Sequence, residues 1–154
     1  MATASMQSLK TLLEHAEGER DAALAALREA EAAAARQDAQ ALHLQDYRTQ
    51  FQDRWSAQFR QATPVALLQC HHGFAQRLDQ AIAQQAQQCQ QQAQRVARAR
   101  HALQRREQRV AAVRKLIERR LRALHQQGER REQRQTDEAA QRASRTHAWA
   151  VDPT

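Results

Sequence analysis

A stripe of apolar residues that recurs every three and four positions constrains this chain more than any other feature. Between residues 68 and 124 the stripe keeps a seven-residue repeat and is not interrupted by proline. Such a long repeat is typical of a coiled-coil seam, which a helix buries against a partner helix. The mostly apolar stripe occupies positions 68, 71, 75, 78, 82, 85, 89, 92, 96, 99, 103, 106, 110, 113, 117, 120 and 124.

A second stripe of the same kind runs from residue 13 to residue 58, and we expect it to be the partner. Between the two stripes, Thr63 can cap a new helix whose first residue is Pro64, a position that tolerates a missing backbone donor. Two long helices joined by a short turn predict an antiparallel hairpin. The apolar members of this second stripe are Leu13, Ala16, Ala23, Leu27, Ala30, Ala34, Ala41, Leu44, Phe51 and Trp55.

The predicted fold is therefore all-α, with two long helices that form an antiparallel coiled-coil hairpin. We expect a single rod-like domain over residues 1–154. The first helix is placed at about residues 6–61, the turn at about 62–64, the second helix at about 65–145 and a disordered tail at 146–154.

A turn centred near residue 63 also sets the register of the two helices. Paired positions then have residue numbers that add to about 126, which places Leu9 opposite Ile117. Beyond about His125 the longer second helix has no partner. We expect this polar overhang to fray when free and to become ordered on a binding partner.

The composition excludes several classes of function. Alanine, glutamine, arginine, glutamate and leucine dominate, and aromatic residues make up only 4% of the chain. These are the proportions of a long helix or coiled coil, which has no walls for an enclosed catalytic pocket. We therefore expect no enzymatic activity, no cofactor and no small-molecule substrate.

The net charge of +7 is unevenly distributed. Residues 1–60 contain seven basic and nine acidic side chains, whereas residues 94–146 contain sixteen basic and six acidic ones. The basic second helix can pair with the acidic first helix, and the remaining positive charge can face an acidic partner, a phosphate backbone or an anionic membrane surface.

The histidines and cysteines near the turn do not predict a metal or catalytic site. Cys70, His71 and His72 are adjacent, and neighbouring residues of a helix point about 100° apart. We expect His71, His72 and Gly73 instead to loosen the helix locally. The two cysteines form no paired motif, and no signal peptide or membrane span is apparent, so we expect a reduced cytosolic protein.

Nucleic-acid binding is an alternative that the basic region leaves open, although we do not expect it. Glutamates at 107, 118, 129 and 132 interrupt the basic face, as on the solvated side of a coiled coil. The residues that could follow a phosphate backbone are Arg105, Arg106, Arg109, Arg114, Lys115, Arg119, Arg120, Arg122, Arg130 and Arg131.

Several short motifs occur in a characteristic order around the turn. They are LKTLLEHAEGERD from residue 9, Tyr47 and Phe51, FAQRLDQAIAQQ from residue 74, KLIERR from residue 115 and QTDEAA from residue 135. In their order and spacing the chain resembles the FliJ family of coiled-coil proteins from the bacterial flagellar type III export apparatus.

This resemblance implies a non-enzymatic stalk that sits in the pore of the hexameric flagellar export ATPase and promotes the assembly and activity of its ring. It further implies contacts with the cytoplasmic domain of the export gate and with export chaperones. The protein would be cytoplasmic and peripherally associated with the inner membrane at the flagellar basal body. The equivalent stalk of a virulence type III secretion system and a basic scaffold coiled coil are the alternatives, and we expect a monomeric or weakly associating chain.

The resemblance also implies a gate-binding cluster near the turn. Phe51 stands where a second tyrosine is common in the family, and Gln85 stands where a histidine can occur. Leu44, Phe51 and Leu78 lie on the predicted seams, so burial between the helices is an alternative role for them. Position by position, the cluster falls on Gln40, Leu44, Tyr47, Phe51, Phe74, Leu78, Ala81 and Gln85.

At the opposite end of the hairpin, the polar second helix is slender enough to enter the pore of a ring. Forked arginine side chains can bind acidic loops around such a pore. The residues expected to contact the ATPase ring are Arg119, Arg120, Arg122, Arg130, Arg131, Arg134 and Arg142.

Overall fold

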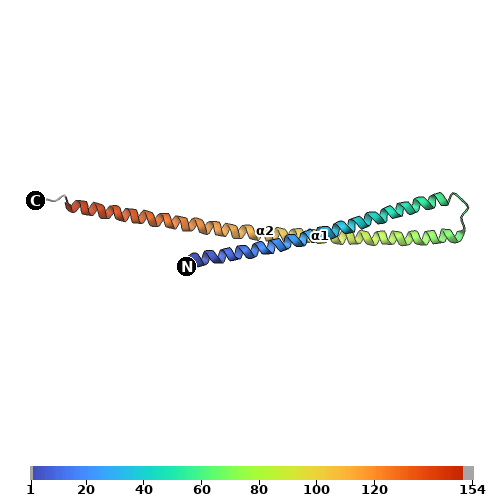
Figure 1. The fold of residues 1–154 in the computed structure, drawn as a ribbon, viewed down its shortest axis with the longest axis horizontal. Helices are drawn as coiled ribbons and strands as arrows, with labels where there is room; N and C mark the ends of the chain where they lie inside the picture. Colours follow the sequence, from blue (N-terminus) through green and yellow to red (C-terminus); the bar gives the residue numbers. More distant parts are fainter. Residues whose placement is uncertain (1, 151–154) are drawn as a thin grey trace. The chain divides into compact units, whose positions relative to one another are not determined.

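The computed structural model describes residues 2–150, and these form two long α-helices, as the sequence predicts (Figure 1). Helix α1 spans Ala2–Gln58 and helix α2 spans Val65–Ala150. The first helix therefore begins earlier and ends slightly earlier than expected. The prediction of disorder is wrong for residues 146–150, which are helical; residues 151–154 lie outside the described part. Alanine-rich sequence and His147 in the last turn favour the helical state there.

The turn between the helices differs in detail from the prediction. Pro64, rather than Thr63, is the residue whose carbonyl begins the new helix, since it accepts hydrogen bonds from the amides of Leu67 (3.1 Å) and Leu68 (3.3 Å). The Thr63 hydroxyl donates to the carbonyl of Gln61 at 3.0 Å and so does not cap α2. This hydrogen bond satisfies a backbone carbonyl within the turn, as short polar side chains in turns often do.

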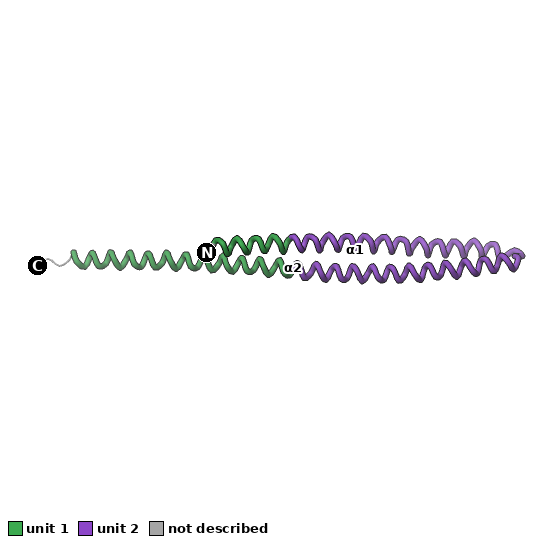
Figure 2. Tube along the Cα trace, turned by 90° about the horizontal axis from the view of Figure 1, so that it is seen from below, with its two compact units in different colours: residues 1–17, 108–154 green, residues 18–107 purple. Residues whose placement is uncertain are grey.

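The chain divides into two compact units (Figure 2). Unit 1 comprises Met1–Glu17 and Gln108–Thr154, and unit 2 comprises Gly18–Glu107. In unit 2 the two helices run antiparallel and lie side by side in both views. In unit 1 the start of α1 lies beside the first part of the α2 segment, which then continues alone. The number of independently folding domains stays a prediction.

Nearly all predicted seam positions are buried or half-buried. The exceptions are Gln58 on α1 and Leu68, Arg106 and Arg120 on α2. A continuous heptad stripe on each helix is therefore what holds the pair together, by excluding water from apolar side chains. The least exposed apolar residues are Ala16, Leu27, Leu78, Val96, Val110 and Val113.

Ion pairs cross the seam of unit 2 in both directions. Arg106 of α2 binds Glu19 of α1 at 2.7 Å, which is the expected pairing of acidic α1 with basic α2, whereas Arg48 of α1 binds Asp79 of α2 at 2.8 Å. Their residue numbers add to nearly 126, so the predicted register is confirmed there. Such partly exposed pairs contribute about 0 to 1 kcal/mol each, and they select the register more than they stabilise the fold.

A hydrogen bond between the buried Gln85 and the half-buried Gln37 also fixes the register of unit 2. The side chain of Gln85 is only 6% exposed, and its amide nitrogen donates to the backbone carbonyl of Gln37 at 2.9 Å and to the side-chain oxygen of Gln37 at 2.7 Å. A shift of one helix along the other would leave this buried donor without an acceptor, which costs about 1–3 kcal/mol. The surrounding glutamine-rich segment, residues 80–94, is helical throughout.

We predict that Gln85→Ala lowers the free energy of unfolding by about 1–2 kcal/mol, because both hydrogen bonds to Gln37 are lost inside the seam. Gln84→Ala is the matched control, since Gln84 is the exposed neighbour of Gln85 and should change the stability by less than about 0.5 kcal/mol. Urea unfolding followed by far-ultraviolet circular dichroism measures both values. Equal effects would show that the glutamine pair does not stabilise the seam.

Candidate protein-binding surfaces

Aromatic rings of both helices gather around His71 near the turn of unit 2. The His71 imidazole stacks on Phe51 with ring centroids 5.0 Å apart and an angle of 6° between the planes. It also contacts the rings of Trp55 at 4.9 Å and Phe59 at 5.0 Å. The predicted loosening of the helix at His71, His72 and Gly73 is therefore wrong: α2 is unbroken there, because His71 is held among the rings of α1.

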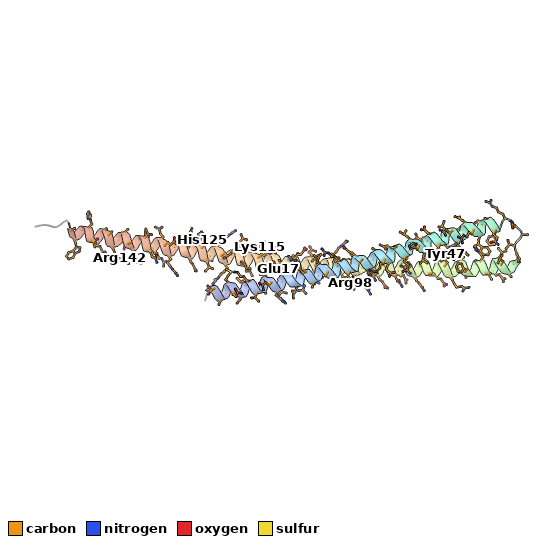
Figure 3. All side chains as sticks on the ribbon, in the orientation of Figure 1. Glu17, Tyr47, Arg98, Lys115, His125 and Arg142 are labelled. Atoms are coloured by element: carbon orange, nitrogen blue, oxygen red, sulfur yellow. The ribbon has the colours of Figure 1, made fainter. Side chains whose placement is uncertain are left out.

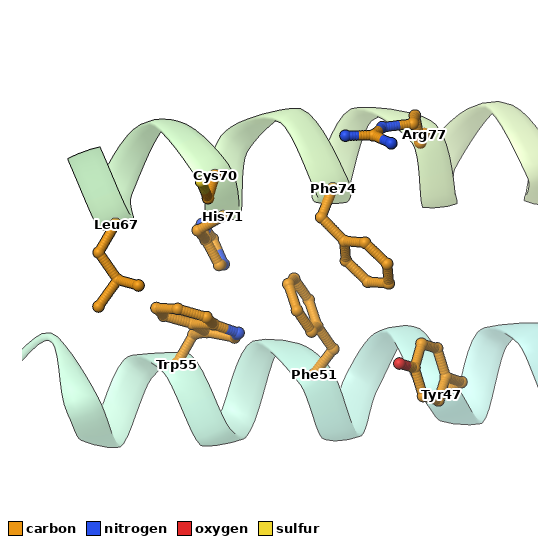
Figure 4. Close-up of a pocket in the computed structure, with 8 residues that line it drawn as sticks. All are labelled: Tyr47, Phe51, Trp55, Leu67, Cys70, His71, Phe74 and Arg77. Carbon is orange, nitrogen blue, oxygen red and sulfur yellow. The ribbon is translucent and has the colours of Figure 1, made fainter. Parts of the chain in front are cut away.

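Beside this cluster the helices leave an open groove of about 350 Å³. The ring of Phe74 lies 4.8 Å from that of Phe51 and 6.4 Å from that of Tyr47, in the range where aromatic pairs attract each other. Figure 4 shows these rings between the two helices. The groove is lined by Tyr47, Phe51, Trp55, Leu67, Cys70, His71, Phe74 and Arg77.

The aromatic side chains of the groove remain accessible to a partner. Tyr47 is 48% exposed and Phe74 is 37% exposed. Exposed aromatic residues are enriched where proteins bind each other. The groove is therefore a candidate binding surface.

The eight residues of the expected gate-binding cluster do not form one exposed patch. Gln40 is exposed like Tyr47 and Phe74, whereas Leu44, Phe51 and Ala81 are half-buried. Leu78 is buried, and so is Gln85, whose amide group binds Gln37. Leu78 and Gln85 therefore belong to the seam rather than to an exposed surface, and the binding role of the cluster stays a prediction.

Sequence reasoning missed five residues that line the groove. It placed Trp55 and His71 on the two seams but did not pair them, although their numbers add to 126. The predicted register would have brought the rings together. Leu67, Cys70 and Arg77 flank the seam of α2, and only the structure shows that they face the same groove.

The part of α2 in unit 1 from His125 to Ala150 is exposed at every position (Figure 3). The expected ATPase-binding residues Arg119, Arg120, Arg122, Arg130, Arg131, Arg134 and Arg142 are all exposed. Two of them are already paired along the helix, Arg122 with Glu118 and Arg142 with Glu138.

Three arginines of this segment come together on its surface. With Gln127 they line a shallow polar hollow of about 420 Å³: they are Arg130, Arg131 and Arg134. No ion pair to a carboxylate within residues 2–150 involves any of the three. Their guanidinium groups are therefore available to bind an anionic partner.

Part of the alternative phosphate-binding face is occupied by contacts within the chain. Arg106 binds Glu19 in unit 2, and Arg114 binds Glu17 in unit 1 at 2.9 Å. These two cations help to hold the helices together, so a nucleic acid would have to compete with α1 for them. The alternative is weakened by this competition.

The described residues contain no metal-ligand cluster or membrane-spanning helix. No three histidine, cysteine, aspartate or glutamate side chains lie together as a metal site requires. Neither helix contains a stretch long and apolar enough to cross a membrane. The candidate surfaces are the aromatic groove and the exposed arginine-rich end of α2.

Two helices packed along heptad seams define a coiled-coil protein, and its aromatic groove and exposed basic segment are candidate surfaces for binding other proteins. Residues 6–148 match a protein family described as Flagellar FliJ protein. The chain belongs to this family and is a component of the flagellar protein export apparatus, a type III secretion machinery. No curated protein matches the chain.

We predict that His71→Ala loosens the aromatic cluster and lowers the free energy of unfolding by about 1–2 kcal/mol, because contacts with three rings are lost. His71→Phe should restore most of the loss, since a phenyl ring can make the same contacts. Thermal unfolding together with near-ultraviolet circular dichroism checks the prediction. The control is His72→Ala, at the exposed neighbouring position; a loss as large as that of His71→Ala would contradict the role of the cluster.

Proposed function

We propose that this protein is the central stalk of the flagellar type III export apparatus. In this role it promotes the assembly and activity of the hexameric export ATPase ring, contacts the cytoplasmic domain of the export gate and escorts export chaperones, and it catalyses no reaction itself. The observation that carries the proposal is the exposed end of α2, where Arg130, Arg131 and Arg134 form no ion pair with a carboxylate among residues 2–150.

The arginine-rich end suits insertion into a ring. A single helix is slender, and its side chains from His125 to Arg145 are polar except for three alanines and one glycine, so this part has no extended apolar patch to adhere to the walls of a pore. The exposed Trp149 lies beyond it, near the end of α2. Arg130, Arg131 and Arg134 can each form charge-assisted hydrogen bonds to acidic loops. If these bonds form better with the assembled ring than with free subunits, the protein shifts the equilibrium toward the hexamer.

The aromatic groove supports the contact with the export gate. It combines exposed rings with a mostly charged or polar surface, and such patches usually mark protein interfaces. The proposal places the protein in the cytoplasm, peripherally associated with the inner membrane at the flagellar basal body. The family membership supports this location and the escort of chaperones.

We predict that deletion of residues 125–154 abolishes stimulation of the purified export ATPase, while far-ultraviolet circular dichroism shows that the remaining helices stay folded. The triple substitution Arg130→Gln, Arg131→Gln and Arg134→Gln should remove most of the stimulation without shortening the helix. Higher ionic strength should weaken stimulation by the unaltered protein, because exposed charges are screened. Phosphate release from ATP measures the effect.

A matched triple substitution tests whether the position of the arginines matters. Arg98→Gln, Arg105→Gln and Lys115→Gln remove the same charge from exposed sites that lie outside the hollow. This control should stimulate the ATPase nearly as well as the unaltered protein. Full stimulation by the truncated chain would rule out insertion of this end into the ring.

We predict that Tyr47→Ala weakens binding of the purified cytoplasmic domain of the export gate by about tenfold, as expected for the loss of an exposed aromatic contact residue. Stimulation of the ATPase should be unchanged. Leu42→Ala is the control, because Leu42 is a 62% exposed apolar residue of α1 that does not line the groove. Isothermal titration calorimetry measures the affinity, and unaltered binding by Tyr47→Ala would exclude the groove as the contact.

A further inference from the structure

The aromatic groove has a positively charged rim. Arg77 lies at its edge, where its Nε donates to the carbonyl of Gly73 at 3.4 Å. No ion pair between Arg77 and a carboxylate exists within residues 2–150. Arg54 follows Phe51 by three positions and Tyr47 by seven, so it lies on the same face of α1 as these two rings. Arg54 also has no ion pair within the described residues.

Acidic residues near the turn do not neutralise this rim. Asp79 is bound by Arg48 at 2.8 Å and is therefore already paired. Asp46 is adjacent in sequence to Tyr47, and Asp53 is two residues from Phe51. Residues one or two apart on a helix do not face the same direction, so these carboxylates point away from the rings. The groove thus combines an apolar floor with excess positive charge.

The size of the groove limits what it can hold. Pockets for drug-sized ligands measure roughly 300–1,000 Å³, and this groove of about 350 Å³ lies at the lower end of that range. One or two side chains of a protein segment fit such a volume. The apolar rings favour an aromatic or long aliphatic side chain, and the arginines favour a carboxylate beside it.

We propose that the groove binds a segment in which an apolar side chain stands next to an aspartate or glutamate, and that Arg77 pairs with this carboxylate. The inference rests on the proposed contact with the cytoplasmic domain of the export gate and specifies the chemistry of the segment that this domain supplies. Arg77 is then a residue that determines specificity, and the exposed rings of Tyr47 and Phe74 hold the apolar side chain.

The same charges disfavour a second copy of this chain as the occupant. In a symmetric dimer the same surface patch faces itself, so Arg54 and Arg77 of both copies would approach each other. Like charges brought together at an interface reduce affinity and select against the wrong partner. Charge complementarity therefore favours an acidic partner of a different kind.

Charge reversal at the rim tests the proposal. Arg77→Glu should weaken binding of the purified cytoplasmic domain of the gate by about tenfold and should flatten the salt dependence of binding. Arg77→Lys should retain most of the affinity, because the positive charge is kept. Arg98→Glu is the matched control: Arg98 is an exposed arginine of the same helix and the same unit, and it should leave the affinity unchanged.

Cys70 offers a second measurement that does not depend on affinity. It is exposed and lines the groove, so an occupant should shield it from a maleimide reagent. Cys89 is half-buried, and burial together with the nearby Asp38 carboxylate raises the pKa of its thiol, which slows its reaction. In a Cys89→Ser variant, the saturating gate domain should slow alkylation of Cys70 at least severalfold, as measured by mass spectrometry.

The possible results separate this inference from the proposed function. If Tyr47→Ala weakens binding while Arg77→Glu does not and Cys70 stays reactive, the gate contact stands and the acidic-segment inference is wrong. If neither variant weakens binding, both are wrong. If Arg77→Glu leaves gate binding intact but changes self-association in sedimentation velocity, the groove binds a second copy, which also overturns the inference.

Discussion

The burial of one narrow apolar stripe on each helix is the interaction on which the rest of this structure depends. Long helices without a partner are marginally stable in water, and most of their stability comes from tertiary packing. Here the stripes contain mainly alanine, valine and leucine, and these side chains are largely buried in the contact between α1 and α2. Side chains off the stripe are therefore free to serve binding, provided that they remain compatible with a helix.

The heptad pattern made the fold predictable, because many positions along each helix define the same apolar stripe. An error at one position, such as exposed Arg106 on the seam, does not alter the phase that the other positions define. Helix ends and the turn depend instead on one or two residues. Thr63 was expected to cap α2, but its hydroxyl binds back to Gln61, since capping needs a backbone geometry that sequence alone does not specify. The end of α2 also depends on a few local residues, and the helix continues to Ala150 rather than ending at about residue 145.

The aromatic groove was less predictable than the seam, because it depends on which residues face each other across two helices. Tyr47 and Phe74 could be named from a resemblance, and their exposed rings are indeed neighbours. The same resemblance also pointed to Gln85, which is buried and bound to Gln37. Arg77 was not noticed at all, because an isolated arginine on a helix has no distinctive pattern until the groove beside it is known.

The pairing of charges explains where the candidate binding surfaces arise within each unit. In unit 1, Glu17 of α1 neutralises Arg114, whereas Arg130, Arg131 and Arg134 lie beyond the reach of α1 and keep their charge. In unit 2, Asp79 pairs with Arg48, and Arg77 has no carboxylate partner among the described residues. An arginine that pairs with a carboxylate on the other helix helps to select the register of the two helices. An arginine without such a pair can instead help to select a binding partner. The same residue type therefore serves folding or recognition according to what the opposite helix offers.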